Sequence, residues 1–352
     1  MRRLVLRLHL TVAAVAGVFL VILGLTGSIM AFEPELTHRL HPALWYVTPG
    51  AAPLPLATLA EAALRTVPGT AVTGYALSSS RDLSYQVYVR SHVIYVNQYT
   101  GAVLGVGASG PDFLGRVHQL HIRLLWTDRQ DRGKSIMSWA GVALLFLGVS
   151  GLYLWWPTKR WRLREGPAAR KWRDLHHVTG IVSLLFLVVL TVTGISIGFD
   201  TQIVPLAYRL TGTAPALMYA QTPLPHSAAQ GRPMISPDAA VAAARQALPD
   251  ATPISVNVPG PTGVYLISAR YPEDRTPGGR SRVIVDPYSG AVLAAEGSRT
   301  APAGSRLVTL NRAIHTGDVF GLASKTVMSL ASLAVILQAV SGLVIWWGRR
   351  GR

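Results

Sequence analysis

Histidine is the side chain with the widest chemistry in this sequence, because its 352 residues include ten histidines and no cysteine. The lack of cysteine excludes thiolate nucleophiles, disulfides, Cys-ligated zinc and Cys-ligated iron–sulfur clusters. Four histidines fall at corresponding positions in two halves of the chain, His9 with His176 and His121 with His315. Metal or redox chemistry would therefore depend on imidazole, on carboxylate or on a prosthetic group.

Two facing imidazoles are the ligand set of six-coordinate haem, with one ring nitrogen on each face of the iron in a dry, apolar slot. Zinc fits less well, because two histidines without a third or a positioned carboxylate leave its tetrahedral shell incomplete. A lone histidine at a membrane interface is often only a snorkelling or capping residue. The spacing alone leaves bis-histidine haem, another metal and structural histidines open, and retention in both copies favours a shared role.

Four segments without Asp, Glu, Lys or Arg are long enough to cross a bilayer, which takes about 20 apolar residues. They are Leu10–Phe32, Ser135–Pro157, His176–Phe199 and Thr326–Gly348. Tryptophan pairs close the second and fourth segments, as aromatic anchoring at the membrane interface predicts. The first apolar run exceeds the roughly 7–15 residues of a signal peptide, so a retained membrane helix is favoured.

The charges predict the orientation of these spans. The chain carries 33 Lys and Arg against 17 Asp and Glu, a net charge of +16, yet only 14% of its residues are charged. That composition argues against a nucleic-acid partner and for a membrane protein. Most of the positive excess lies before the first span, between the second and third, and after the fourth. By the positive-inside rule both termini and the middle loop are cytoplasmic, and the two long segments are external.

The chain reads as a tandem duplication, with the same motifs in the same order in each half. Matching motifs are Thr26-Gly27 with Thr193-Gly194, Phe32-Glu33 with Phe199-Asp200, Ser150-Gly151 with Ser341-Gly342, and the nonapeptides Val96–Leu104 and Val285–Leu293. Each half crosses the membrane twice, so the two halves share one orientation. This predicts a parallel repeat of helix, external domain and helix.

Each external segment begins with an alanine-rich helical pattern, Leu56–Thr66 in the first and a run after the candidate N-cap Ser236 in the second. Alternating runs such as Tyr85–Val89 and Arg282–Val285 then predict strands. The predicted fold class is a four-transmembrane-helix bundle with two external α+β domains. The predicted boundaries are 1–32, 135–157, 176–199 and 326–348 for the membrane helices, 33–134 and 200–325 for the external domains, 158–175 for the basic loop and 349–352 for the tail.

Together these motifs resemble the PepSY-associated transmembrane helix family, and the external segments look like PepSY domains. The resemblance covers nearly the whole chain. It rests on Leu8-His9, Leu120-His121, the run Arg173-Asp174-Leu175-His176 followed by Gly180, the run Ile314-His315-Thr316-Gly317-Asp318 followed by Gly321, and the Ser-Gly and Trp-Trp helix ends. Span one departs from the pattern, since it lacks a glycine four residues after His9.

Members of that family studied as ferric-siderophore reductases are inner-membrane proteins with two b-type haems. The resemblance implies that His9 and His176 are the axial ligands of one haem and His121 and His315 those of the other, with no catalytic side chain required. The adjacent His177 and His118 are alternative ligands. Candidate partners for haem propionates are Arg7, Arg173, Arg123 and Arg312.

The implied function is electron transfer across a bacterial inner membrane, from a quinol or a cytoplasmic reductase to a periplasmic acceptor such as a ferric siderophore. The alternative is a membrane-anchored PepSY module that binds or modulates a periplasmic partner, such as a peptidase, without redox chemistry. A transporter fits less well, because the middles of the spans hold little beyond Gln338 and a few Ser and Thr residues.

Overall fold

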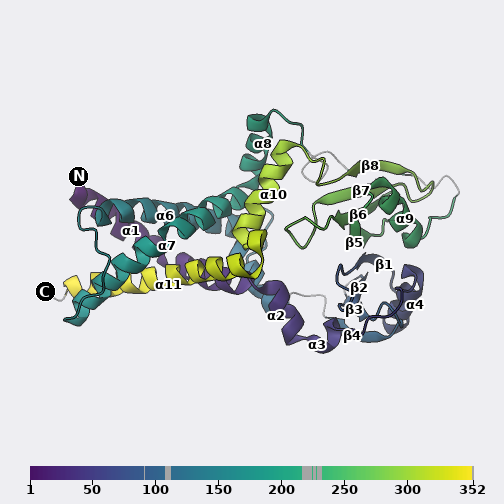
Figure 1. Cartoon of the computed structure of the whole chain (residues 1–352), viewed down its shortest axis with the longest axis horizontal. Helices are drawn as coiled ribbons and strands as arrows, with labels where there is room; N and C mark the ends of the chain where they lie inside the picture. Colours follow the sequence, from purple (N-terminus) through teal and green to yellow (C-terminus); the bar gives the residue numbers. More distant parts are fainter. Residues whose placement is uncertain (91, 108–111, 216–223, 225–226, 228–231, 351–352) are drawn as a thin grey trace. The chain divides into compact units, whose positions relative to one another are not determined.

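Four long helices form the membrane part of the computed structural model, which describes residues 1–90, 92–107, 112–215, 224, 227 and 232–350 (Figure 1). They are α1 (Arg2–Met30), α6 (Arg132–Trp155), α7 (Ala168–Gly198) and α11 (Leu322–Arg350). Each contains a stretch long and apolar enough to cross a bilayer. The chain is therefore a multi-pass membrane protein with four candidate spans among the described residues. Residues 351–352 of the predicted tail lie outside them.

The long helices form a bundle in one compact unit, made of Met1–Glu33, Phe113–Leu206 and Leu310–Arg352. Each helix contacts two neighbours in the cyclic order α1–α6–α7–α11, so α1 lies diagonally opposite α7. Small residues allow this close approach. A Cβ atom at Gly24 of α1 would lie 2.7 Å from the backbone oxygen of Ser332 on α11. The middle of the bundle is filled by Ala16, Leu20, Ala140, Leu187, Ala331 and Val335.

Shorter helices adjoin the bundle. Helix α5 (Phe113–Arg123) contacts α1 and α6, and α8 (Asp200–Thr211) follows α7. Helix α10 (Ala303–Thr316) ends at Gly317, whose φ of +79° is the left-handed conformation that glycine adopts most readily after a helix. The 3-10 helix η1 (Asp318–Phe320) then leads into α11. The glycine of the His-Thr-Gly-Asp motif thus serves the turn between α10 and α11.

The second compact unit, Pro34–Asp112 with Ala207–Thr309, holds an eight-stranded antiparallel sheet within the described residues. Its strands are β1 (Val72–Ala76), β2 (Tyr85–Val89), β3 (His92–Val96), β4 (Val103–Gly107), β5 (Thr252–Asn257), β6 (Tyr265–Arg270), β7 (Ser281–Val285) and β8 (Val292–Glu296). The strand order is β4-β3-β2-β1-β5-β6-β7-β8. Each repeat supplies a four-stranded meander, and the meanders join where Tyr75 of β1 pairs with Val256 of β5.

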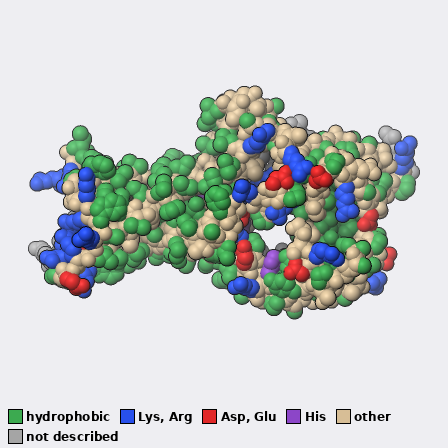
Figure 2. Space-filling model, in the orientation of Figure 1, with side chains coloured by type: hydrophobic (Ala, Val, Ile, Leu, Met, Phe, Trp, Pro, Cys, Tyr) green, Lys and Arg blue, Asp and Glu red, His purple; other side chains and the backbone are tan. Residues whose placement is uncertain are grey.

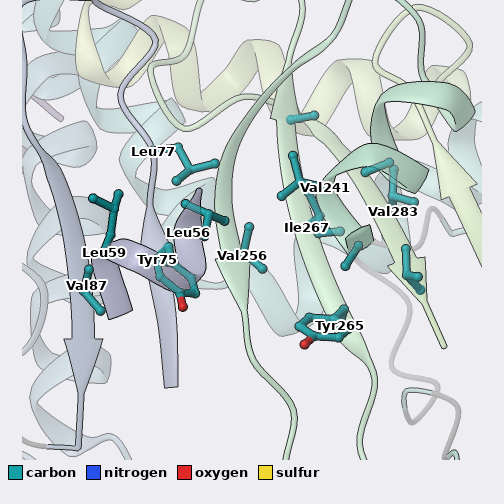
Figure 3. Close-up of a cluster of buried hydrophobic side chains, with 14 of the residues drawn as sticks. Leu56, Leu59, Tyr75, Leu77, Val87, Val241, Val256, Tyr265, Ile267 and Val283 are labelled. Atoms are coloured by element: carbon teal, nitrogen blue, oxygen red, sulfur yellow. The ribbon is translucent and has the colours of Figure 1, made fainter. Parts of the chain in front are cut away.

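Two helices complete the core of this unit, α4 (Leu56–Thr66) and α9 (Pro237–Ala247). Figure 3 shows their apolar side chains against those of the strands, with Leu59, Val87 and Ile267 fully buried. Burying a side chain of this size contributes about 1.5–3 kcal/mol. The carboxylate of Asp238 on α9 accepts backbone N–H bonds from Leu56 at 2.8 Å and Ala57 at 3.3 Å, so the second repeat caps the helix of the first.

Short helices α2 (Glu33–Leu40) and α3 (Pro42–Trp45) precede the sheet segment of the first repeat. The predicted helix Leu56–Thr66, the strand Tyr85–Val89 and the N-cap Ser236, which accepts the Ala239 N–H at 3.1 Å, are confirmed. The predicted fold class is confirmed as well: membrane helices with α+β regions between the members of each pair.

The structure differs in how the strands associate. The sequence predicts separate domains at 33–134 and 200–325, whereas their strands form one sheet through the β1–β5 pair. The physical reason is that β1 and β5 would otherwise each expose a row of unpaired backbone groups at a sheet edge. Helix α7 also begins at Ala168, within the stretch 158–175 predicted as a loop.

The junction between the two meanders gives a first prediction. A Cβ atom at Gly74 would lie 2.8 Å from the backbone oxygen of Val256, so Gly74→Ala forces β1 and β5 apart. We expect thermal unfolding of the detergent-solubilised chain, followed by circular dichroism, to shift down by about 2–8 °C. The control is Gly260→Ala, since a Cβ there meets nothing within 4 Å. Equal midpoints for both variants would contradict the role of this junction.

Candidate functional site

The four predicted histidines lie at two levels of the helical bundle. His9 near the start of α1 and His176 near the start of α7 stand on diagonally opposite helices, within electrostatic range of one another. His121 of α5 and His315 of α10 form the second pair, with ring centres 6.5 Å apart and ring planes inclined by 52°. Thr26 of α1 contacts His121 and so marks the second level. It lies about 25 Å from His9 along α1, at 1.5 Å per residue.

At the first level each imidazole contacts a serine near the C-terminal end of a neighbouring helix. The Nδ1 atom of His9 lies 2.8 Å from Oγ of Ser150 on α6. The Nδ1 atom of His176 lies 2.9 Å from Oγ of Ser341 on α11. The two halves of the chain therefore make the same contact twice.

At the second level the partner is a threonine. The Nδ1 atom of His121 lies 2.8 Å from Oγ1 of Thr26 on α1. The Nδ1 atom of His315 lies 3.0 Å from Oγ1 of Thr193 on α7, and 3.2 Å from the backbone oxygen of Leu190. All four hydroxyl residues were visible in the sequence only as markers of the repeat.

A glycine follows each hydroxyl residue and lies against the same imidazole. A Cβ atom at Gly194 would lie 2.9 Å from Cε1 of His315, and one at Gly27 would lie 3.2 Å from Cε1 of His121. At the first level the fit is looser, with 3.6 Å from Gly151 to His9 and 3.5 Å from Gly342 to His176. In each Thr-Gly or Ser-Gly motif, the Thr or Ser thus supplies the hydrogen-bonding oxygen, and the Gly leaves the space that the imidazole ring occupies.

The second-level rings are strongly desolvated. Burial lowers the pKa of His121 to about 3, with His315 and His118 adding to the effect. Burial also lowers the pKa of His315 to about 4, despite its contact with the Leu190 carbonyl. Both side chains nevertheless retain some accessible surface. At neutral pH both imidazoles are therefore uncharged, as metal ligands must be.

The distance between the rings suits one metal atom. When two imidazoles bind one metal from opposite sides, each metal–nitrogen bond is about 2 Å long. With the distance from each nitrogen to its ring centre added, the two ring centres lie roughly 6 Å apart. The observed separation of His121 and His315 is close to this value. Within the described residues, no group of three or more His, Asp or Glu side chains could hold a metal ion by itself. The donor set fits an ion that brings its other ligands with it, which is what haem does.

The neighbouring histidines are placed differently. Nδ1 of His118 lies 3.1 Å from the Glu33 carboxylate, so this ring faces an acid. His177 stands edge-on to His176, with ring centres 6.3 Å apart, close to Arg160 and Asp174. The structure brings His9, His176, His121 and His315 into matching environments and leaves His118 and His177 outside that pattern.

The four candidate arginines also differ. Among the described residues, the buried Nε atom of Arg123 has no hydrogen-bond partner, while Nη1 of the same guanidinium lies 3.5 Å from Asp131. Arg312 is near enough to His315 to interact with it electrostatically. Arg173 donates to the backbone oxygen of Ala169 at 3.1 Å, and Arg7 is exposed. Of the four candidate arginines, Arg123 is therefore the one with a buried N–H group that lacks an acceptor among the described residues.

Acidic residues that the sequence presented only as motif members form ion pairs in the unit that contains the bundle. Asp174 is fully buried and binds Arg164 through two side-chain bonds of 2.8 and 2.9 Å. Asp200 accepts a bond of 2.7 Å from Lys134. Asp318 lies 3.5 Å from the buried Lys325. Sequence signals existed in each case, since each acid lies beside a motif histidine or a span end. Asp174 and Asp318 pair with bases ten and seven residues away, whereas Asp200 pairs with a lysine 66 residues away.

Fold and site define a multi-pass membrane protein with paired histidines inside a duplicated helical bundle. A family model described as the PepSY-associated TM region matches residues 6–349. The chain belongs to this family. No curated protein matches the chain in sequence.

The buried carboxylate of Asp174 yields a second prediction. Asp174→Asn removes the negative charge and replaces one of the two oxygens that accept from Arg164 with an NH₂ group. This breaks the ion pair and releases the basic loop, since breaking a pair with a buried member is destabilising. We expect trypsin to cleave the solubilised full-length chain after Arg160, Arg162 or Arg164 at least several times faster than in the wild type. The control is Glu165→Gln in the same loop, because the Glu165 side chain is fully exposed. Equal cleavage rates for the two variants would contradict this role.

Proposed function

We propose that the chain is an inner-membrane protein with two b-type haems that passes electrons across the bilayer to an acceptor outside. The observation that carries this proposal is the repeated environment of four histidines. Each has Nδ1 bonded to a hydroxyl, and Nε2 makes no hydrogen bond within the described part of the chain. One nitrogen of each ring is held, and the other is available to a metal.

In this proposal His9 and His176 hold one haem, and His121 and His315 hold the other. When bound, haem supplies a one-electron iron(III)/iron(II) couple at each level. The chain itself supplies the ligands, the apolar surroundings and the spacing along the bundle. Arg123 and Arg312 stand near the second pair and are suited to pair with propionate carboxylates.

Charge supports the proposed orientation. Figure 2 shows basic side chains gathered at the end of the bundle that carries both termini, while its sides are largely apolar. That end contains the start of α1, the end of α6, the start of α7 and the end of α11. The positive-inside rule makes it cytoplasmic, so the His9 level faces the cytoplasm and the sheet-containing segments are periplasmic.

The proposed acceptor is iron(III) in a siderophore complex. The net step adds one electron to iron(III) and forms iron(II), while the siderophore oxygens remain bonded until the weaker iron(II) complex dissociates. A quinol supplies two electrons and two protons, and therefore reduces two such complexes; a cytoplasmic reductase is the other candidate donor. No side chain needs to act as a nucleophile or a general acid in this reaction.

The haem content of the purified chain tests the proposal directly. We expect full-length protein from haem-sufficient cells to show a Soret band and about two haems per chain, on the bis-histidine argument. His315→Ala should lose about one haem, because the second pair then has a single ligand. His118→Ala is the control, since that ring faces Glu33. Colourless wild-type protein would contradict the proposal and favour the non-redox module, and full haem content in the His315 variant would contradict the ligand pair.

The acceptor is tested separately. Reduced full-length protein mixed anaerobically with a ferric hydroxamate should reoxidise and release iron(II), which an iron(II) chelator detects by colour. The gallium(III) complex of the same hydroxamate is the control, because it matches iron(III) in charge and is not reduced under these conditions. Reoxidation that needs iron supports the acceptor class. Absence of reoxidation by hydroxamate and catecholate complexes alike would contradict it.

A further inference from the structure

The hydroxyl group that contacts Nδ1 of each histidine also lies within hydrogen-bond distance of a carbonyl oxygen in its own helix. Thr26 Oγ1 lies 2.5 Å from the Ile22 carbonyl oxygen, and Thr193 Oγ1 lies 2.7 Å from that of Val189. Ser150 Oγ and Ser341 Oγ lie 2.7 and 2.6 Å from the carbonyl oxygens four residues before them. All four hydroxyls therefore turn back onto their own helix.

Counting protons assigns the imidazole tautomer. A hydroxyl has one hydrogen, and a carbonyl oxygen only accepts. At these short distances the hydroxyl hydrogen goes to the carbonyl of the preceding turn. The hydroxyl oxygen is then left with lone pairs toward the histidine, so Nδ1 must carry the hydrogen. The neutral ring consequently has its free lone pair on Nε2.

His315 provides an independent check. Its Nδ1 atom also lies 3.2 Å from the backbone oxygen of Leu190. A carbonyl oxygen is a partner for an N–H group and not for a bare ring nitrogen. Two acceptors from one turn of α7, Leu190 and Thr193, thus face the same atom. Both require the hydrogen on Nδ1.

We propose that Thr26, Ser150, Thr193 and Ser341 are positioning residues that fix the four imidazoles as Nδ1–H tautomers and direct Nε2 toward the haem iron. This inference rests on the proposed function and adds residues outside the ligand set to it. A hydrogen bond from Nδ1–H to an oxygen makes the ring a stronger electron donor, and such partners orient metal-ligating histidines. The hydroxyls therefore favour iron(III) and lower the reduction potential at each level.

The glycine beside each hydroxyl completes the arrangement. A side chain at Gly194 would displace the His315 ring from its two acceptors, because its Cβ would come within 2.9 Å of the ring. The equivalent position at the first level is less restrictive, at 3.5 Å for Gly342. The Thr-Gly pairs therefore set ring position more tightly than the Ser-Gly pairs.

The test compares two threonines on the same helix. Thr193→Val removes the hydroxyl acceptor of His315, leaves the Leu190 carbonyl as its other acceptor, and keeps the side-chain shape. Thr191→Val is the matched control, because Thr191 is buried and donates to the Leu187 carbonyl at 2.5 Å without contacting a histidine. Both are made in the full chain and purified with haem. Optical redox titration then measures the iron(II) to iron(III) ratio of each haem at fixed ambient potentials.

We expect Thr193→Val to raise that ratio several-fold for one haem and to lower haem affinity about tenfold. Thr191→Val should match the wild type in both. Ser341→Ala against Ser183→Ala makes the same comparison at the first level, since within the described part of the chain Ser183 donates to carbonyl oxygens of its own helix. Haem-loaded Thr193 and Thr191 variants with equal potentials would overturn the inference and leave the proposed function unaffected.

A second measurement does not depend on haem. Nitrogen-15 NMR of haem-free full-length protein with labelled histidine distinguishes the two neutral tautomers. We expect His121, assigned by its loss in His121→Ala, to be protonated on Nδ1 in the wild type and to show mixed tautomers in Thr26→Val, which removes the hydroxyl that faces Nδ1. Protonation on Nε2 in the wild type would overturn the inference. A wild-type chain that never binds haem would overturn the proposed function instead.

Discussion

An imidazole inside an apolar helical bundle must have its polar nitrogens satisfied, and the structure of this bundle depends on that constraint. Unpaired polar groups are costly where water is absent. Four Nδ1–hydroxyl contacts, each between different helices, meet the demand of one nitrogen in each ring. They require a hydroxyl residue at the level of each ring and a glycine beside it, which leaves room for the ring. Ring orientation, helix spacing and tautomer thus follow from one type of contact.

Neither half of the chain can form these sites alone. The first half supplies His9 and His121, and the second supplies His176 and His315, so each pair needs one member from each repeat. The sheet unit has the same dependence, since β1 of one repeat pairs with β5 of the other and Asp238 caps α4. Duplication here built a structure in which the copies complete one another. This argues for a role shared by the paired histidines over four unrelated structural ones.

The sequence was sufficient for features that repeat along the chain and insufficient for contacts across it. Hydropathy located the four spans, and the duplication singled out the four histidines from the ten in the sequence. The partners Thr26, Ser150, Thr193 and Ser341 appeared as repeat markers, but their link to the histidines depends on which helices are neighbours. No local pattern encodes that. The β1–β5 pair and the Asp200–Lys134 contact escaped for the same reason, because pairing partners far apart in the chain are fixed by the tertiary fold.

The central claim is that two histidine pairs each supply both axial ligands of one haem. Electron paramagnetic resonance of the oxidised full-length protein tests it most directly, because axial ligation by two imidazoles gives low-spin iron(III). We expect two low-spin signals that together represent all the haem, with one of them lost in His176→Ala and the other in His315→Ala. A single signal, high-spin iron in the wild type, or one variant that abolishes both signals while the chain stays folded would contradict it.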